Sequence, residues 1–332
     1  MEVDLHITNR CNLRCCHCVY SSGERMMPDM TISTIRKLIS RFKLMGVEEI
    51  HITGGEPLLN REVFDIISLL HKNNFLVRIQ TNGLLINEDI AKKLKSTGID
   101  HVLINIDGME NFHNKFRNNK NSFESAINAV KICLNEGLFT RVNTVLNKDN
   151  AQQVESLIKK AKQLGVSQHS FFYFTPIGRG KNLKDKVFSL SEWKNVQNMI
   201  IDIAKKLDCL DMIRIQDVFH EGEFDYSHSK ICRSDNCLIM SDGNVYHCVF
   251  FTESPYSIGN INEEDIYTIW KRCPDFIDMI LYKNSNRRCD NKKCGGGCPG
   301  MAYCINGSIS ACDSRCEPNN KVISNCIRRY RN

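Results

Sequence analysis

The sequence lacks the long apolar runs that cross membranes. None of its hydrophobic segments approaches the roughly 20 residues that a membrane-spanning helix needs. It also lacks a signal peptide, because the first four residues, Met-Glu-Val-Asp, lead straight into an expected strand. These absences exclude a transmembrane protein and predict a cytoplasmic location, where a disulfide framework would have no oxidising compartment.

The chain also lacks a concentration of charge of one sign. Its formal net charge of +6 is spread over 332 residues, and basic pairs such as Arg287-Arg288 and Lys292-Lys293 are typical of solvated surface. We therefore expect neither a nucleic-acid partner nor a membrane partner. A chain of this length has enough residues for a large core and for two domains.

Cysteine, in contrast, is abundant, with 17 residues, and clustered cysteines in a cytoplasmic chain indicate metal binding. The first cluster, Cys11-x3-Cys15-x2-Cys18, follows a short apolar run. Three thiolates can hold three irons of a 4Fe-4S cluster and leave the fourth iron open, whereas electron-transfer clusters take four cysteines. The alternative is a zinc knuckle or a set of buried thiols, although structural zinc prefers pairs of CxxC-type hooks. Cys16 does not fit the spacing and is interpreted as a bystander.

Strand-like and helix-like segments alternate through the first half of the chain. Six strands separated by helices predict a parallel α/β sheet, and six are fewer than the eight of a closed barrel. The expected strands are Val3–Thr8, Glu49–Thr53, Leu76–Gln80, His101–Ile106, Arg141–Leu146 and His169–Phe174. A helix over Ser191–Leu207 and a hairpin over Leu238–Cys248 are expected further along.

The Cys11-x3-Cys15-x2-Cys18 loop resembles the CxxxCxxC loop of radical S-adenosylmethionine (SAM) enzymes, and residues 54–57, Gly-Gly-Glu-Pro, resemble their GGEP motif. In that family the open iron chelates the amino and carboxylate groups of SAM. The resemblance implies a partial (β/α)6 radical SAM barrel, the catalytic cysteines Cys11, Cys15 and Cys18, S-adenosyl-L-methionine, and a 4Fe-4S cluster. It also implies cofactor-binding roles for His17, Gly54, Gly55, Glu56, Pro57, Asn105, Asn143 and Arg179. For Asn105, Asn143 and Arg179, capping of strand ends and loops is the alternative.

The remaining cysteines concentrate near the C-terminus, where Cys232-x10-Gly243-x4-Cys248 and the Cys294–Cys298 segment resemble the SPASM extension of peptide-modifying radical SAM enzymes. We expect a radical SAM core over 1–185, a linker over 186–230 and a Cys-rich SPASM-like extension over 231–332. A pair of zinc sites is the alternative. The resemblance implies Cys232, Cys237, Cys248 and Cys298 for one auxiliary 4Fe-4S cluster, and Cys289, Cys294 and Cys316 for a second. Cys304 or Cys312 would complete the second cluster, or its iron is open to substrate.

The resemblance implies reductive cleavage of SAM to a 5′-deoxyadenosyl radical and oxidation of a peptide, by a crosslink such as a thioether or by dehydrogenation. Peptide epimerisation with a cysteine hydrogen donor, and a dehydrogenase or epimerase of a sugar or aminocyclitol, are alternatives. A multi-cluster electron carrier is the non-enzyme alternative, against which the three-cysteine loop and GGEP argue. Because the first strand begins at residue 3, we expect no leader-binding domain in this chain and a separate leader-binding protein or direct peptide binding. Flavodoxin or ferredoxin is the expected reductant.

Overall fold

The computed structural model describes residues 1–216, 236–285, 298–311 and 313. Five of the cysteines assigned to metal by sequence lie outside the described residues: Cys232, Cys289, Cys294, Cys312 and Cys316.

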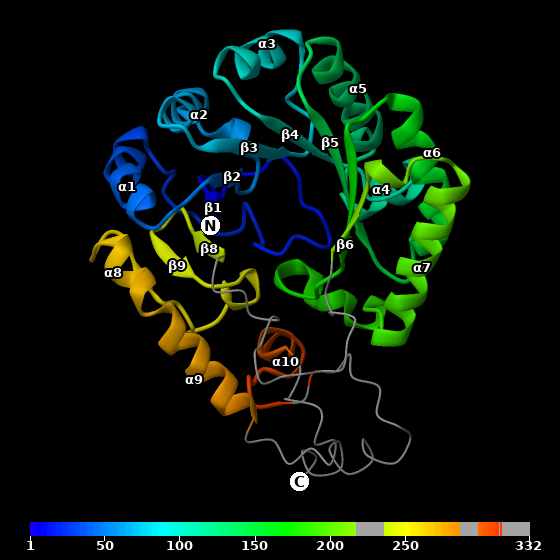
Figure 1. The fold of residues 1–332 in the computed structure, drawn as a ribbon. Helices are drawn as coiled ribbons and strands as arrows, with labels where there is room; N and C mark the ends of the chain where they lie inside the picture. Colours follow the sequence, from blue (N-terminus) through cyan, green and yellow to red (C-terminus); the bar gives the residue numbers. More distant parts are fainter. Residues whose placement is uncertain (217–235, 286–297, 312, 314–332) are drawn as a thin grey trace, which may run out of the picture.

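The described residues form one curved sheet in the order β10-β9-β8-β1-β2-β3-β4-β5-β6-β7. Parallel pairing runs from β8 through β1–β6 to β7, and β9 and β10 are added antiparallel at one edge. The sheet curves around an interior space and helices cover its outer face (Figure 1), so the expected partial barrel is confirmed. The strands are β1 Glu2–His6, β2 Glu49–Thr53, β3 Leu76–Thr81, β4 His101–Asn105, β5 Thr140–Leu146, β6 Gln168–Tyr173, β7 Ile213–Ile215, β8 Asn236–Ile239, β9 Asn244–Tyr246 and β10 Gly259–Asn260.

Some of the helices begin at a side-chain cap. Thr31 accepts a hydrogen bond from the Thr34 N–H at the start of α1, and Ser189 forms a capping box with Glu192 at the start of α7. Most of the helices bury apolar side chains in clusters that they share with the strands. The helices are α1 Ile32–Leu44, α2 Val63–Lys72, α3 Glu88–Ser96, α4 Glu110–Phe116, α5 Ser122–Asn135, α6 Val154–Leu164, α7 Leu190–Lys206, α8 Ile266–Lys271, α9 Cys273–Ser285 and α10 Pro299–Asn306.

Alternation along the strands separates an apolar outer face from a polar inner face. On β2, Ile50 and Ile52 are buried in the core that the helices cover, whereas His51 lies on the inner face. The same alternation places Asp4 beside His51 and Asn105 beside Asn143. The interior of the barrel is therefore lined by groups that can bind and orient a polar substrate.

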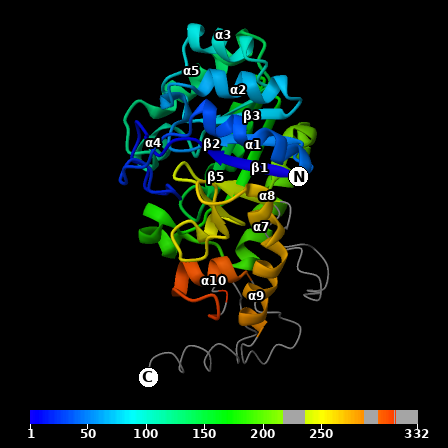
Figure 2. The same ribbon diagram turned by 90° about the vertical axis from the view of Figure 1, so that its left-hand side faces the viewer.

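The strands of the C-terminal segment continue the barrel sheet, because β8 pairs with β1. The expected hairpin is confirmed as β8 and β9. Helices α9 and α10 lie at the opposite end of the molecule from α2 and α3, as Figure 1 and Figure 2 both show. The domain boundaries at residues 185 and 231 stay predictions.

Candidate functional site

The cysteine loop follows β1 and crosses the open interior of the curved sheet (Figure 1). Cys15 is buried, Cys11 and Cys18 are half-buried, and Cys16 is exposed. Burial raises the pKa of Cys15 to about 12; Arg117 opposes this rise, and the nearby thiols of Cys18 and Cys11 add to it. The three thiols thus share one space. Because thiolate is the metal-binding form, iron binding here must release protons.

The glycines at 54 and 55 let the end of β2 pack backbone to backbone against this loop. The Gly55 N–H donates to the Thr8 carbonyl oxygen at 2.7 Å. A Cβ on Gly55 would lie 2.2 Å from the Arg10 carbonyl oxygen, and one on Gly54 would lie 2.5 Å from that of Thr8. Neither position has room for a side chain, so the glycines fix the distance between β2 and the cysteine loop.

Glu56 ties the same segment to the next strand. Its carboxylate is fully buried and accepts hydrogen bonds from the Thr81 hydroxyl at 2.8 Å, the Asn82 N–H at 2.9 Å and the Leu58 N–H at 3.2 Å. Burial raises the pKa of Glu56, and these donors oppose the rise. Pro57 begins the short helical turn that follows. In this structure the side chain of Glu56 therefore acts as a brace between β2 and β3.

Asn105, the last residue of β4, is paired with Asn143 in the middle of β5. Asn105 accepts a hydrogen bond from Gln80 Nε2 at 3.1 Å. Asn143 is buried, and its side-chain oxygen has no hydrogen-bond partner among the described residues. A buried acceptor without a partner is costly, so Asn143 is suited to a hydrogen-bond donor on a bound molecule.

Arg179 holds the cysteine loop from the side of β6. Its Nε donates to the Cys15 carbonyl oxygen at 2.8 Å, and one terminal nitrogen contacts the Ser22 carbonyl oxygen at 3.1 Å and Glu24 at 2.7 Å. Its own N–H donates to the Cys18 carbonyl oxygen at 3.1 Å. Arg179 thus positions the loop, and contact with a nucleotide stays a prediction.

A buried ion pair between Arg117 and Asp107 supports the cysteine loop. Arg117 donates to Asp107 at 2.8 Å and 2.7 Å, and both side chains are almost fully buried. Burial alone raises the pKa of Asp107, but Arg117, followed by His17, lowers it, and the net pKa is below the ordinary value. His17 stacks on Phe116 with ring centroids 3.9 Å apart, and burial lowers its pKa to about 4. His17 is therefore a neutral part of this support.

The described C-terminal cysteines fall into two groups. Cys248, Cys298 and Cys304 lie close together: burial raises the pKa of Cys248 to about 12, with a further rise from Cys298, and both thiols act in the same way on Cys304. On β8, Leu238 packs in the same cluster as Cys248, whereas Cys237 faces the helix-covered core, where its neighbour is Cys273. The assignment of Cys237 to the cluster of Cys248 stays a prediction that this geometry does not support.

Comparison with known sequences decides the family. The profile of the Radical SAM superfamily matches residues 5–161, and a profile described as the SPASM iron–sulfur cluster-binding domain matches residues 232–299. The chain belongs to the radical SAM superfamily and carries a C-terminal SPASM domain.

The chain is similar to proteins whose names state different products. The Fe-coproporphyrin III synthase of Methanosarcina barkeri is 25% identical over 94% of this chain and 86% of its own length. An AdoMet-dependent heme synthase of Nitratidesulfovibrio vulgaris is 24% identical over 96% and 93%. The mycofactocin maturase MftC of Mycolicibacterium smegmatis is 25% identical over 93% and 81%.

Solved structures agree on the radical SAM fold. Streptococcus suis SuiB bound to S-adenosylmethionine aligns with a TM-score of 0.76, at 18% identity, over 95% of this chain and 77% of SuiB. The enzyme anSMEcpe with bound AdoMet and a peptide aligns with a TM-score of 0.69, at 20% identity, over 93% and 92%. Among the described residues of this chain, no helix has the length and apolarity to cross a bilayer.

The residues present fit the groups that the radical SAM family implies. Cys11, Cys15 and Cys18 supply soft thiolate ligands to one shared space, and Gly54 and Gly55 keep the neighbouring backbone free of side chains. The structure also adds two residues that the motifs did not indicate as supports, Asp107 and Arg117. A signal was present, since Asp107 follows β4 by two residues, but its partner ten residues later carries no motif.

Proposed function

We propose that this radical SAM enzyme oxidises a ribosomally made peptide, removing two hydrogens by a crosslink such as a thioether or by dehydrogenation. The observation that carries the proposal is that two sets of cysteines, the loop cysteines and the set that contains Cys248, lie around the interior of the same barrel. Tyr20 packs in the same apolar cluster as Cys248 and also lies near Cys18. The solved structures of SuiB bound to its precursor peptide and of anSMEcpe bound to a peptide support a peptide as substrate.

Cys11, Cys15 and Cys18 would hold the SAM-binding 4Fe-4S cluster, and Cys248 and Cys298 would hold an auxiliary cluster. When bound, these groups and SAM supply a 5′-deoxyadenosyl radical that removes a hydrogen atom from the substrate and an acceptor for the electron that the substrate then loses. Arg179 and the Asp107–Arg117 pair hold the loop in place during this chemistry. Asn143 offers its unpartnered oxygen to a donor on the substrate.

The proton that the oxidised substrate loses needs an acceptor inside the barrel. His51 and Asp4 are neighbours on its inner face, and His51 Nδ1 lies 2.8 Å from an Asp4 carboxylate oxygen. With the proton on Nδ1, the lone pair on Nε2 is buried and has no partner among the described residues. We assign the role of proton acceptor to His51 Nε2, oriented by Asp4.

The test uses reconstituted enzyme, dithionite and the synthetic form of a short Cys- or Gly-rich peptide encoded beside this gene. Oxidation predicts a product lighter by about two mass units, while epimerisation would leave the mass unchanged in light water and add one deuterium in heavy water. His51→Asn should slow the two-unit loss about 100-fold or more while SAM cleavage continues, because a general base contributes about that much. His71→Asn, at an exposed histidine, is the matched control. SAM cleavage without any change in the peptide would contradict the peptide proposal.

An iron tetrapyrrole is the second candidate substrate. It is favoured by the match to the Fe-coproporphyrin III synthase and the heme synthases over most of their lengths. Incubation of the reconstituted enzyme with Fe-coproporphyrin III, SAM and dithionite, followed by chromatography, separates the two candidates. Conversion of the porphyrin, with no change in the peptide, would support the tetrapyrrole and contradict peptide oxidation.

A further inference from the structure

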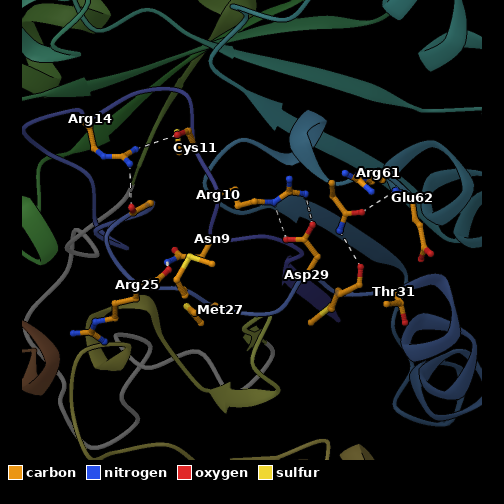
Figure 3. Close-up of a pocket in the computed structure, with 14 residues that line it drawn as sticks. Asn9, Arg10, Cys11, Arg14, Arg25, Met27, Asp29, Thr31, Arg61 and Glu62 are labelled. Carbon is orange, nitrogen blue, oxygen red and sulfur yellow. Dashed lines mark hydrogen bonds and ion pairs between the residues drawn. The ribbon is translucent and has the colours of Figure 1, made fainter.

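A cavity of about 550 Å³ lies on the outer side of the cysteine loop, between this loop and the segment that leads into α1 and α2. Cys11 forms part of its wall, and Figure 3 shows the side chains that surround it. The end of β2 contacts the same loop at Thr8 and Arg10 through Gly54 and Gly55. The cavity therefore reaches the cysteine loop at Cys11.

The cavity is basic. Four arginines, Arg10, Arg14, Arg25 and Arg61, line it together with two carboxylates. Arg10 pairs with one of the two, Asp29, with its Nε 3.3 Å from the carboxylate. The other carboxylate accepts a hydrogen bond from the N–H of the first residue of α1 at 2.5 Å. The cavity thus presents an excess of positive charge.

Two of the guanidinium groups are available to a partner. Arg25 and Arg61 are exposed, and among the described residues neither side chain has a hydrogen-bond or ion-pair partner. Met26, next to Arg25, lines the same cavity and is fully exposed. Unpaired exposed cations are complementary to the surface of an acidic protein.

The cavity is also connected to the redox site by hydrogen bonds. Arg14 donates to the Cys11 carbonyl oxygen and to the Gly23 carbonyl oxygen, each at 3.0 Å. An electron that arrives at this cavity therefore has a short route through Cys11. Positive charge beside the route attracts a negatively charged donor and raises the rate of encounter.

We propose that this cavity is the docking site of an acidic electron-donor protein that carries a flavin or an iron–sulfur group. In each transfer the reduced donor loses one electron and the iron–sulfur site at Cys11 gains it, with no bond made or broken. The proposal rests on the proposed radical SAM activity. It adds the surface that the donor binds and the residues that select it, Arg25 and Arg61.

The test compares two reductants with the reconstituted holoenzyme and follows 5′-deoxyadenosine formation from SAM. One reductant is flavodoxin with flavodoxin reductase and NADPH, and the other is dithionite, which needs no docking site. Arg25→Glu with Arg61→Glu should slow the flavodoxin-driven reaction at low salt by about tenfold or more. The dithionite-driven reaction should stay within about twofold of the unchanged enzyme. Lys92→Glu, at an exposed residue of α3, is the matched control and should change neither reaction.

A second readout is the affinity for oxidised, flavin-loaded flavodoxin, measured by biolayer interferometry, which the charge-reversed variant should lower about tenfold or more. If both reactions fall in that variant, Arg25→Gln with Arg61→Gln replaces it. Equal flavodoxin-driven rates in this milder variant and the unchanged enzyme would then overturn the proposal, as would unchanged affinity. Binding of inorganic phosphate with no effect on flavodoxin would show an anion site and also overturn it. Absence of 5′-deoxyadenosine with dithionite would instead contradict the proposed activity.

Discussion

Replacing Asp107 by Asn tests the buried ion pair beneath the cysteine loop. Asp107 accepts two hydrogen bonds from Arg117, at 2.8 Å and 2.7 Å, and one from the Val145 N–H at 3.0 Å. An Asn oxygen can keep the bond to Val145. Its amide nitrogen then faces the Arg117 guanidinium, so a buried cation loses its counter-charge.

The expected loss of stability is large. Removing one partner of a buried pair costs about 3–5 kcal/mol, because the remaining charge stays out of water. The free energy of unfolding of a domain is only about 5–15 kcal/mol, so the variant should lose about a fifth of it or more. Adding Arg117→Met should recover part of the loss, since the unpaired charge is then absent.

Urea unfolding of the iron-free protein, followed by circular dichroism, measures this difference. Asp149→Asn is the matched control, because Asp149 pairs with Lys186 at 3.1 Å on the surface, where such a pair is worth about 1 kcal/mol or less. A loss below about 1 kcal/mol for Asp107→Asn, or a double variant less stable than Asp107→Asn alone, would refute the reasoning.

Two further predictions follow from buried groups. Gly55→Ala should lower the iron content of the holoprotein by about four irons, because the new Cβ would lie 2.2 Å from a carbonyl oxygen of the cysteine loop. Iron analysis checks this. The control Gly165→Ala, at a position with open space around it, should keep the full iron content. Burial lowers the pKa of His6 and His17 to about 4 and those of His113 and His169 to about 3, so the unfolded chain binds these protons first as pH falls. The iron-free protein should lose about 5 kcal/mol between pH 7 and pH 5.5, with stability rising with pH; urea titrations with no such slope would contradict it.

Local patterns in the sequence were enough to predict the parallel α/β sheet, and the resemblance to radical SAM enzymes implied its closure into a partial barrel. Alternation of apolar residues and regular helix signals gave all six core strands, and the Asp-Gly turn gave the hairpin of β8 and β9. The parallel pairing of β8 with β1 was not predicted, because it joins segments more than 200 residues apart and neither carries a signal for the other. Strand β7 was not predicted either, because it has only three residues and its pairing with β6 is a tertiary contact.

The candidate site divides in a similar way. Motif spacing predicted the loop cysteines and the glycines, whose roles follow from local geometry. The support by Asp107 and Arg117 and the hold of Arg179 on loop carbonyl oxygens depend on tertiary placement, which spacing does not encode. Alternation along β8 places Cys237 in the core and Leu238 in the cluster of Cys248. This alternation is a sequence signal that could have separated Cys237 from Cys248.

The central claim is that Cys11, Cys15 and Cys18 hold the iron–sulfur cluster that cleaves SAM. The most direct measurement compares 5′-deoxyadenosine formation under dithionite by the unchanged enzyme and by the variant with all three cysteines replaced by alanine. The account predicts that the variant forms none and still binds iron at its C-terminal cysteines. SAM cleavage that persists in the variant would contradict the account.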